Sequence, residues 1–149
     1  MVVPTLYKRS LEEAQATYTQ VISPATSAKI RYLMRLNALE GSGTRMNKEA
    51  AGYRAGGKTG TAEKVVNGAY SSGLNLNVFS SAFPLDNPRY AMVVLVDEPK
   101  AENAQTGVTA GWNAGEVTGR IIQRAAPLLG IGPDFNEMID KNLVPVELR

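Results

Sequence analysis

The chain has 149 residues, of which 44% are hydrophobic and 20% charged, so it can form one globular domain or part of a larger one. Its net charge of +2 arises from 16 basic and 14 acidic residues spread along the chain, which argues against nucleic-acid binding. The absence of Cys and His excludes disulfides, thiolate catalysis and Ser-His-Asp machinery. Any catalysis must use Lys, Ser, Thr, Tyr or carboxylates, and we predict neither a metal site nor a cofactor.

The first third of the chain predicts helices. The N-terminal segment begins with a capping-box pattern between Ser10 and Glu13 but then loses apolar periodicity. Residues 24–40 are a stronger helix prediction, because Ser23 can cap the helix and Pro24 suits its first position. The predicted apolar side of this helix consists of Ile30, Leu33, Met34 and Leu36.

The middle of the chain predicts an antiparallel sheet. Residues 45–55 are polar and are expected to form a loop. "TAEKVV" then predicts a strand that runs into an Asn-Gly turn, and residues 76–85 and 89–99 predict two further strands joined by "DNP". The last of these strands is apolar on both faces, which is typical of a strand inside a sheet.

A final helix is predicted from about residue 113, and Pro127 and Gly130 close it. Residues 133–149 form a tail without a clear pattern. The coarse order is helix, three strands, helix, which is an α+β arrangement. The predicted apolar side of the final helix consists of Val117, Ile121, Ile122 and Ala125.

Two motifs overlap in "AAGYRAGGKTGTAEKV", residues 50–65. From Gly52, "GYRAGGKT" fits the phosphate-loop pattern G-x-x-x-x-G-K-[ST], and from Lys58, "KTG" is a motif of β-lactamases and penicillin-binding proteins. A phosphate loop needs a buried strand before it and a helix starting at its Lys. The flanking residues favour a strand instead. The motif is preceded by the polar stretch "TRMNKEAA" and followed by "TGTAEKVVNGAY", which contains β-branched residues and ends in a turn signal. "VVLVDE", residues 93–98, imitates a second nucleotide-binding motif, so this alternative stays open.

Several separate segments resemble one family. "GGKTGTAEKV", "FSSAFPLDNPRYAMVVLVDEPK" and "TAGWNAGEVTGRIIQRAAPLLGI" follow one another as in the C-terminal part of class B penicillin-binding proteins, and "EGSGT" at 40–44 is similar too. The chain resembles the cell-division peptidoglycan D,D-transpeptidases of Gram-negative bacteria, over roughly residues 4–132. The resemblance implies a partial penicillin-binding/transpeptidase (β-lactamase-like) fold with three antiparallel strands and flanking helices. Residues 1–132 would be the domain portion and 133–149 the tail.

In that family a serine attacks the D-Ala-D-Ala bond of a stem peptide, and the acyl group then passes to an amine of a neighbouring peptidoglycan strand. β-Lactams trap the same serine. The resemblance implies that the Lys58 ammonium lies in the cleft and assists proton transfer, while Thr59 and Thr61 bind the substrate carboxylate. Gly60 would let the ligand approach the strand, and the Thr61 N–H would form half of the oxyanion hole. The substrate peptide would add to the edge of the sheet.

The chain departs from the family because no Ser is followed by Lys three residues on or by Asn two residues on. The S-x-x-K and S-x-N motifs are therefore missing. We expect a C-terminal fragment that is inactive alone, from a periplasmic parent anchored in the inner membrane by a segment outside these residues. Expected partners are stem peptides and β-lactams in the complete domain, the missing N-terminal half, a second copy of the fragment and cell-division proteins. A non-catalytic peptide- or protein-binding module is the other alternative.

The remaining polar and aromatic residues receive structural interpretations. Glu63 and Lys64 are expected to be solvated, and Asp97 and Glu98 are expected to diverge at a strand end as a solvated turn. Trp112 is expected to pack at the start of the final helix.

Overall fold

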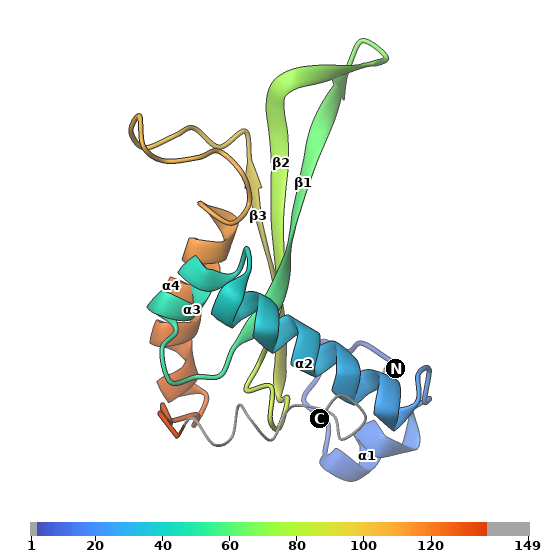
Figure 1. Ribbon diagram of the computed structural model, residues 1–149. Helices are drawn as coiled ribbons and strands as arrows, with labels where there is room; N and C mark the ends of the chain where they lie inside the picture. The colour runs from blue at the N-terminus through green and yellow to red at the C-terminus, as the bar shows by residue number, and fades with distance from the viewer. Residues whose placement is uncertain (1–2, 137–149) are drawn as a thin grey trace.

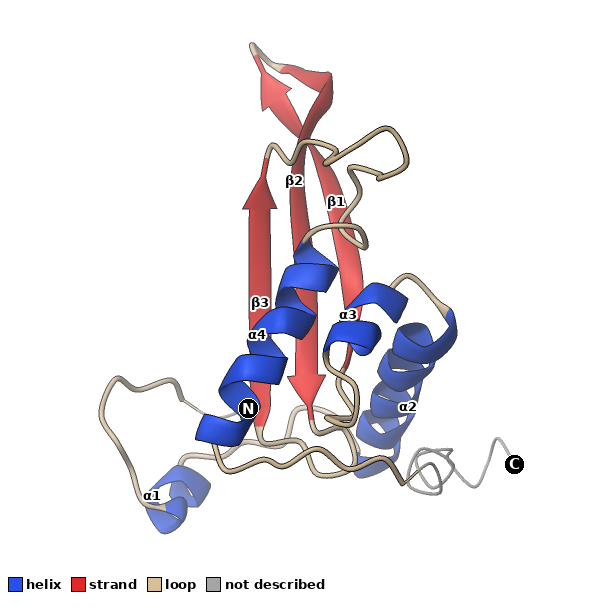
Figure 2. Cartoon of the chain, turned by 90° about the vertical axis from the view of Figure 1, so that its left-hand side faces the viewer, coloured by secondary structure: helices blue, strands red, loops and turns tan. Residues whose placement is uncertain are grey.

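The computed structural model describes residues 3–136 as an antiparallel sheet with its last two helices against one face and its long helix beside the edge of its first strand (Figures 1 and 2). Within these residues the sheet has three strands in the order β1-β2-β3, so β1 and β3 are its edges. The α+β prediction is confirmed. In chain order the elements are α1 (Leu11–Ala16), α2 (Pro24–Glu40), α3 (Thr44–Glu49), β1 (Gly56–Val66), β2 (Ala69–Phe83), β3 (Tyr90–Asp97) and α4 (Ala114–Leu128).

Helix α2 has the predicted bounds and caps. The Ser23 side chain accepts a hydrogen bond from the Thr26 N–H, and Pro24 is the first helical residue. The predicted apolar side is wrong as a buried side, since Ile30 is 44% and Leu33 57% exposed. The buried residues of this helix are instead Arg35 and Ala38. The helix therefore buries small and hydrogen-bonding groups, while Ile30 and Leu33 face outwards.

The two short helices differ in how well the sequence anticipates them. Helix α1 contains the predicted capping box, in which Ser10 and Glu13 exchange side-chain-to-backbone hydrogen bonds. The loop prediction for residues 45–55 is wrong at its start, because α3 covers residues 45–49. Helix α3 buries Met46 completely. Its helical state therefore comes from packing against the fold and not from local propensity.

Strands β1 and β2 form a long hairpin that extends beyond the helices (Figure 1). The predicted turn is confirmed, because Asn67 and Gly68 have φ values of 52° and 83°, the combination that a tight hairpin turn requires. Strand β2 begins at Ala69, earlier than predicted, because it pairs with β1 up to this turn.

Strand β3 alternates between partly buried and exposed side chains. The prediction that both its faces are covered is wrong, because Val93 and Leu95 are both 59% exposed. Helix α4 packs on one face of the strand, which is why the side chains of that face are partly covered. The apolar residues on the other face have no cover among the described residues.

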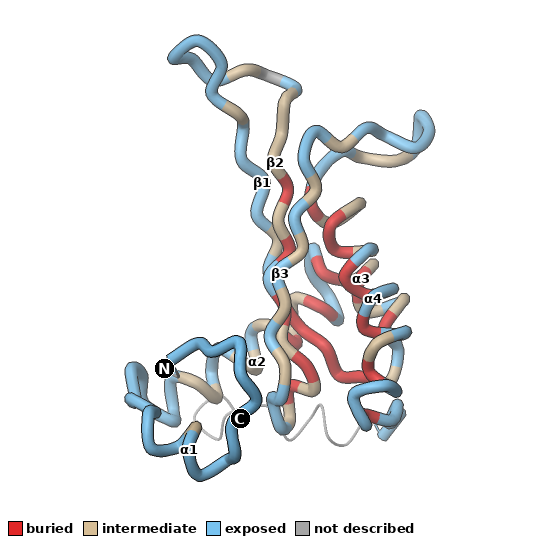
Figure 3. Tube along the Cα trace, turned by 180° about the vertical axis from the view of Figure 1, so that it is seen from behind, coloured by how far each residue is buried: buried red, intermediate tan, exposed pale blue. Residues whose placement is uncertain are grey.

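The core lies between the sheet and helices α3 and α4, as Figure 3 shows. Phe79 of β2 is fully buried at its centre. The apolar side predicted for the final helix is wrong in part, since Val117 and Ile121 are exposed while Ile122 is buried. The face of α4 that packs inwards consists mainly of small residues: Ala114, Gly115, Thr118, Gly119, Ile122 and Ala126. Small residues let the backbones approach closely, which periodicity of large apolar residues does not reveal.

The last described residues are fastened to the loop before β1. Arg54 donates from its Nε to Asp86 Oδ1 at 3.2 Å and from an Nη to Asp134 Oδ2 at 2.9 Å. The Asp134 N–H also donates to the Gly52 carbonyl at 2.8 Å. The beginning of the predicted tail is thus in contact with the rest of the fold, while residues 137–149 lie outside the described part.

Candidate functional site

The residues Lys58 to Thr61 are extended and lie in the edge strand β1. No helix starts at Lys58, so the phosphate-loop alternative is wrong. Side chains alternate along a strand, and Thr59 and Thr61 lie opposite Phe79 and Asn77 of β2 in the register. The two threonines therefore share the face on which α4 packs, and the Lys58 and Gly60 positions belong to the other face.

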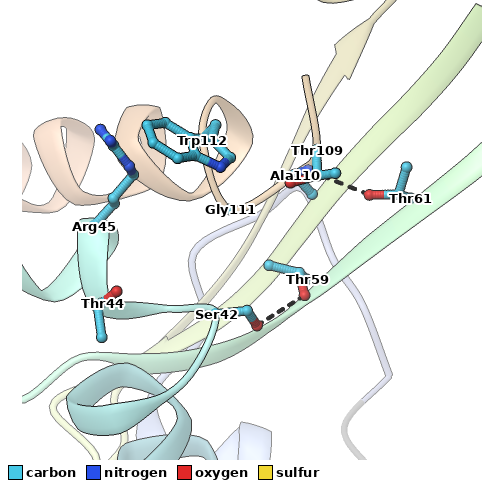
Figure 4. Close-up of a pocket in the computed structure, with 9 residues that line it drawn as sticks. All are labelled: Ser42, Thr44, Arg45, Thr59, Thr61, Thr109, Ala110, Gly111 and Trp112. Atoms are coloured by element: carbon cyan, nitrogen blue, oxygen red, sulfur yellow. Dashed lines mark hydrogen bonds between the residues drawn. The ribbon is translucent and has the colours of Figure 1, made fainter. Parts of the chain in front are cut away.

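A pocket of about 260 Å³ lies beside the two threonines (Figure 4). Strand β1, the turn between α2 and α3, and the loop before α4 supply its walls. Most of the lining side chains carry hydroxyls, with one guanidinium and one indole, so the pocket is suited to a hydrogen-bonding ligand. The lining residues are Ser42, Thr44, Arg45, Thr59, Thr61, Thr109, Ala110, Gly111 and Trp112.

The Lys58 ammonium reaches from its own face around the free edge of β1 to the threonine side. Its Nζ donates to Thr59 Oγ1 at 2.8 Å and to the Thr59 carbonyl at 2.9 Å. Lys58 is exposed, so the charge is accessible beside the pocket. The sequence-predicted Lys58 and Thr59 are thus brought together by contact.

The two threonine hydroxyls have different partners. Thr59 Oγ1 lies 3.0 Å from Ser42 Oγ, whereas Thr61 Oγ1 accepts the Ala110 N–H at 3.2 Å (Figure 4). Thr61 thereby ties β1 to the loop that precedes α4. Because the backbone N–H must be the donor, the Thr61 hydroxyl keeps its own proton for another acceptor.

Glycines in β1 serve two different purposes. A Cβ on Gly57 would lie 2.3 Å from the Ser80 carbonyl oxygen and 2.5 Å from a Phe79 ring carbon, so this position requires Gly for packing. A Cβ on Gly60 would meet nothing closer than Val78 Cβ at 3.8 Å. Packing within the described residues therefore does not require a glycine at position 60.

Asn77 supports the loop beside the pocket, and the sequence analysis missed it. It is fully buried, and its Nδ2 donates to the Val108 carbonyl at 2.6 Å and to Asn113 Oδ1 at 2.9 Å. Its Oδ1 has no hydrogen-bond partner in the described part of the chain. A polar residue alternating with Leu and Val inside a predicted strand was the available signal for this role.

Arg45 and Trp112 form one wall of the pocket through a cation–π contact. The Arg45 guanidinium lies 3.6 Å from the centre of the Trp112 ring, and its Nη1 contacts Glu116 Oε2 at 3.2 Å (Figure 4). Trp112 packs just before α4, as predicted, but it also faces the pocket.

The acidic pair at the end of β3 lies outside the site, and its predicted divergence is wrong. Asp97 and Glu98 converge on Lys64, whose Nζ lies 3.0 Å from Asp97 Oδ1 and 2.7 Å from Glu98 Oε1. The hydrogen bond to Glu98 raises the pKa of Lys64, and the hydrogen bond to Asp97 contributes to the same shift. Lys64 is therefore paired and not simply solvated, while Glu63 is exposed as expected.

Residues 3–136 contain neither a cluster of metal-ligating side chains nor a membrane-spanning helix. No three Asp or Glu side chains gather as they would around a metal ion. None of the helices in this part of the chain has the length and apolar character needed to cross a bilayer.

The K-T-G motif, which is typical of β-lactamases and penicillin-binding proteins, lies in the edge strand of an antiparallel sheet. Comparison with known sequences agrees, since residues 1–122 match the penicillin binding protein transpeptidase domain. The chain belongs to this transpeptidase domain family.

Two curated relatives illustrate the match. Stage V sporulation protein D of Bacillus subtilis is 36% identical over 138 residues, covering 93% of this chain and 20% of the relative. The probable peptidoglycan D,D-transpeptidase FtsI of Caulobacter vibrioides is 38% identical over 120 residues, covering 75% of this chain and 20% of the relative. The chain thus spans about a fifth of the length of these relatives.

Solved structures show the same fold. The apo transpeptidase domain of Burkholderia pseudomallei penicillin-binding protein 3 is 30% identical, with a TM-score of 0.65, over 78% of this chain and 34% of that one. Penicillin-binding protein 3 of Mycobacterium tuberculosis complexed with aztreonam is 26% identical, with a TM-score of 0.56, over 77% of this chain and 27% of that one. The similarity therefore covers about a third of a transpeptidase domain.

Proposed function

We propose that this chain is the C-terminal portion of the transpeptidase domain of a peptidoglycan D,D-transpeptidase and that β1 binds the substrate carboxylate. The observation that carries the proposal is the placement of the Thr59 and Thr61 hydroxyls on a pocket, with the Lys58 ammonium 2.8 Å from Thr59 Oγ1. Two hydroxyl donors and a cation form a charge-assisted site for a small carboxylate.

In the proposed mechanism, the stem peptide lies along the free edge of β1 and adds to the sheet by main-chain hydrogen bonds. Its terminal carboxylate accepts from Thr59 and Thr61, and the open space at Gly60 lets the peptide approach the strand. The backbone N–H of Thr61 donates to the oxyanion that forms when the D-Ala-D-Ala carbonyl is attacked. Lys58 stabilises deprotonated hydroxyls nearby and assists proton transfer.

The nucleophile in this proposal comes from a part of the parent outside these 149 residues, because the chain contains no S-x-x-K or S-x-N motif. The complete enzyme forms an acyl-serine intermediate and cross-links stem peptides in cell-wall synthesis, and β-lactams inhibit it. The parent acts in the periplasm, anchored to the inner membrane and associated with cell-division proteins. The 149-residue chain alone is inactive.

The exposed sheet face supports a further partner assignment. Val93 and Leu95 project from the edge strand β3 without cover in residues 3–136. In the complete protein the N-terminal half of the domain covers this face, and in the isolated chain a second copy does so. Light scattering of the isolated chain across a range of concentrations tests the second statement, and a monomer at every concentration would contradict it.

Fluorescent penicillin labelling tests the proposed function. We expect no covalent labelling of the chain alone, and labelling when the preceding half of the domain is added. Lys58→Ala should abolish the labelling of the mixture, whereas Ser71→Ala, a change in β2 outside the pocket, should preserve it. Labelling of the isolated chain, or unchanged labelling with Lys58→Ala, would overturn the assignment.

A further inference from the structure

A chain of four polar side chains runs from Lys58 into the C-terminal turn of α2. Lys58 Nζ donates to Thr59 Oγ1, which lies 3.0 Å from Ser42 Oγ, and Ser42 Oγ donates to Asn37 Oδ1 at 3.2 Å. Figure 4 shows the Thr59 and Ser42 hydroxyls pointing toward each other at the edge of the pocket. Two of these residues, Ser42 and Asn37, have no role in the function proposed above.

The direction of these hydrogen bonds follows from the Gly57 carbonyl, an acceptor that contacts the last side chain of the series, Asn37. Asn37 Nδ2 lies 2.8 Å from the Gly57 carbonyl oxygen, which can only accept, so Oδ1 must be the atom facing Ser42. Ser42 has one hydroxyl proton and gives it to that oxygen. Both side-chain hydrogen bonds of Ser42 form at the same time only when Thr59 donates to Ser42 Oγ, and Thr59 Oγ1 in turn accepts from Lys58.

This direction makes the two carboxylate-binding threonines unequal. The Thr61 hydroxyl proton has no acceptor in the contacts of the described residues, and Thr61 can donate to a ligand at once. The Thr59 proton is engaged with Ser42 and must turn away before it can bind a carboxylate. When it turns, Ser42 can reverse its own hydroxyl and donate to Thr59 Oγ1. Asn37 Oδ1 is still satisfied afterwards, because it also accepts the Ser42 backbone N–H at 3.1 Å.

We propose that Ser42, held by Asn37, is a positioning residue for carboxylate binding: its hydroxyl accepts the Thr59 proton in the free chain and donates to Thr59 once a carboxylate takes that proton. This inference rests on the proposed function of β1. In the bound state Thr59 accepts from both Ser42 and Lys58 and donates to the ligand. Successive hydrogen bonds polarise one another, so the donation from Ser42 strengthens the bond between Thr59 and the carboxylate.

The chain offers matched variants for a test. Ser42 is exposed, so Ser42→Ala removes the hydroxyl without opening the core. Ser42→Thr retains a hydroxyl at the same place and should restore function. Ser71→Ala removes a hydroxyl of β2 that does not line the pocket and serves as the control.

The isotope-labelled 149-residue chain is titrated by NMR with N-acetyl-D-alanyl-D-alanine and with its C-terminal carboxamide. We expect Ser42→Ala to weaken binding of the acid by about 3- to 10-fold, the effect of one hydrogen bond, while Ser42→Thr and Ser71→Ala stay within about twofold. Binding of the carboxamide should not respond to Ser42→Ala. An equal loss for acid and amide, or no loss for the acid, would overturn the proposal.

A ligand-free measurement separates this inference from the proposed function. Three-bond couplings to the Thr59 methyl carbon report the side-chain rotamer, and we expect one rotamer in the wild type and in Ser42→Thr but averaging in Ser42→Ala. If the wild type binds the acid and the amide equally, the proposed carboxylate site is contradicted. The couplings still decide whether Ser42 positions the Thr59 side chain. Unchanged couplings in Ser42→Ala would refute the positioning role by themselves.

Discussion

Replacing Gly57 by Ala should destabilise the fold strongly, although the change adds only one methyl group to a strand. The added Cβ would lie 2.3 Å from the Ser80 carbonyl oxygen and 2.5 Å from a Phe79 ring carbon. The oxygen belongs to the paired strand β2, and the ring is fully buried in the core, so neither neighbour is a flexible side-chain end. Overpacking of this kind costs about 1–3 kcal/mol, and we expect the upper end because a backbone atom must move.

Gly60→Ala is the matched control three residues along the same strand. The nearest atom to its added Cβ is 3.8 Å away, which is an ordinary contact, and the φ value of Gly60 is not among the positive ones. We expect the control to be as stable as the wild type or more stable by about 0.5–1 kcal/mol, because Ala loses less backbone entropy than Gly on folding.

Urea unfolding of both purified variants, followed by circular dichroism, measures the difference. The midpoint for Gly57→Ala should fall, and that for Gly60→Ala should not. Equal stability of the two variants, within about 0.5 kcal/mol, would refute the close packing of β1 on β2 that the reasoning requires.

The other expectations concern ion pairs and helix packing. The hydrogen bond from Arg54 lowers the pKa of Asp134 below the ordinary value of an aspartate, so the stabilisation is present above that ordinary value and is lost as the pH falls through the lower folded value. Asp134→Asn should therefore flatten the acid end of the stability profile measured by unfolding at stepped pH, and an unchanged profile would argue against the pair. Gly119→Ala places a Cβ 2.4 Å from the Met46 carbonyl oxygen and should lower the melting temperature by several degrees in calorimetry, whereas unchanged melting would contradict close α3–α4 contact. Lys64→Met should change the melting temperature little, with any loss reduced by salt; a large, salt-independent loss would contradict a surface ion pair.

Local signals in the sequence predicted the element boundaries that local chemistry determines. Ser23 and Pro24 place the start of α2, and Asn67 with Gly68 places the β1–β2 turn. In each case the residue acts on backbone groups within three positions of itself. Such contacts are visible in the sequence because both partners are close together in the chain.

Burial was predicted less well, because periodicity identifies an apolar side but not the side that meets the fold. Helix α4 turns Gly115 and Gly119 towards Phe79 and α3 and leaves Val117 exposed. The contact depends on how closely the backbones approach, and this depends on residues far away in the chain. Helix α3 was missed for the same reason, since its only fully buried residue is Met46.

The candidate site was predicted in its strand residues but not in their supports. The K-T-G motif and the family resemblance identify Lys58, Thr59 and Thr61, whereas Asn37 and Ser42 carry no motif. Ser42 lies 17 residues before Thr59, and the contact depends on the turn that links α2 to α3. A serine between two glycines in "EGSGT" gave no indication of a hydroxyl directed at the strand.

Strand β1 has to satisfy two conflicting demands, and its sequence separates them by position. At Gly57 it packs against β2 and is held by the Asn37 side chain, which fixes the carbonyl just before Lys58. At Gly60 it is open, so its backbone can be approached without disturbing the core. A rigid start and an accessible continuation place Lys58 and the two threonine hydroxyls beside the pocket, on an edge strand that residues 3–136 leave unpaired on one side. This division explains why two glycines only three residues apart should respond in opposite ways to the same substitution.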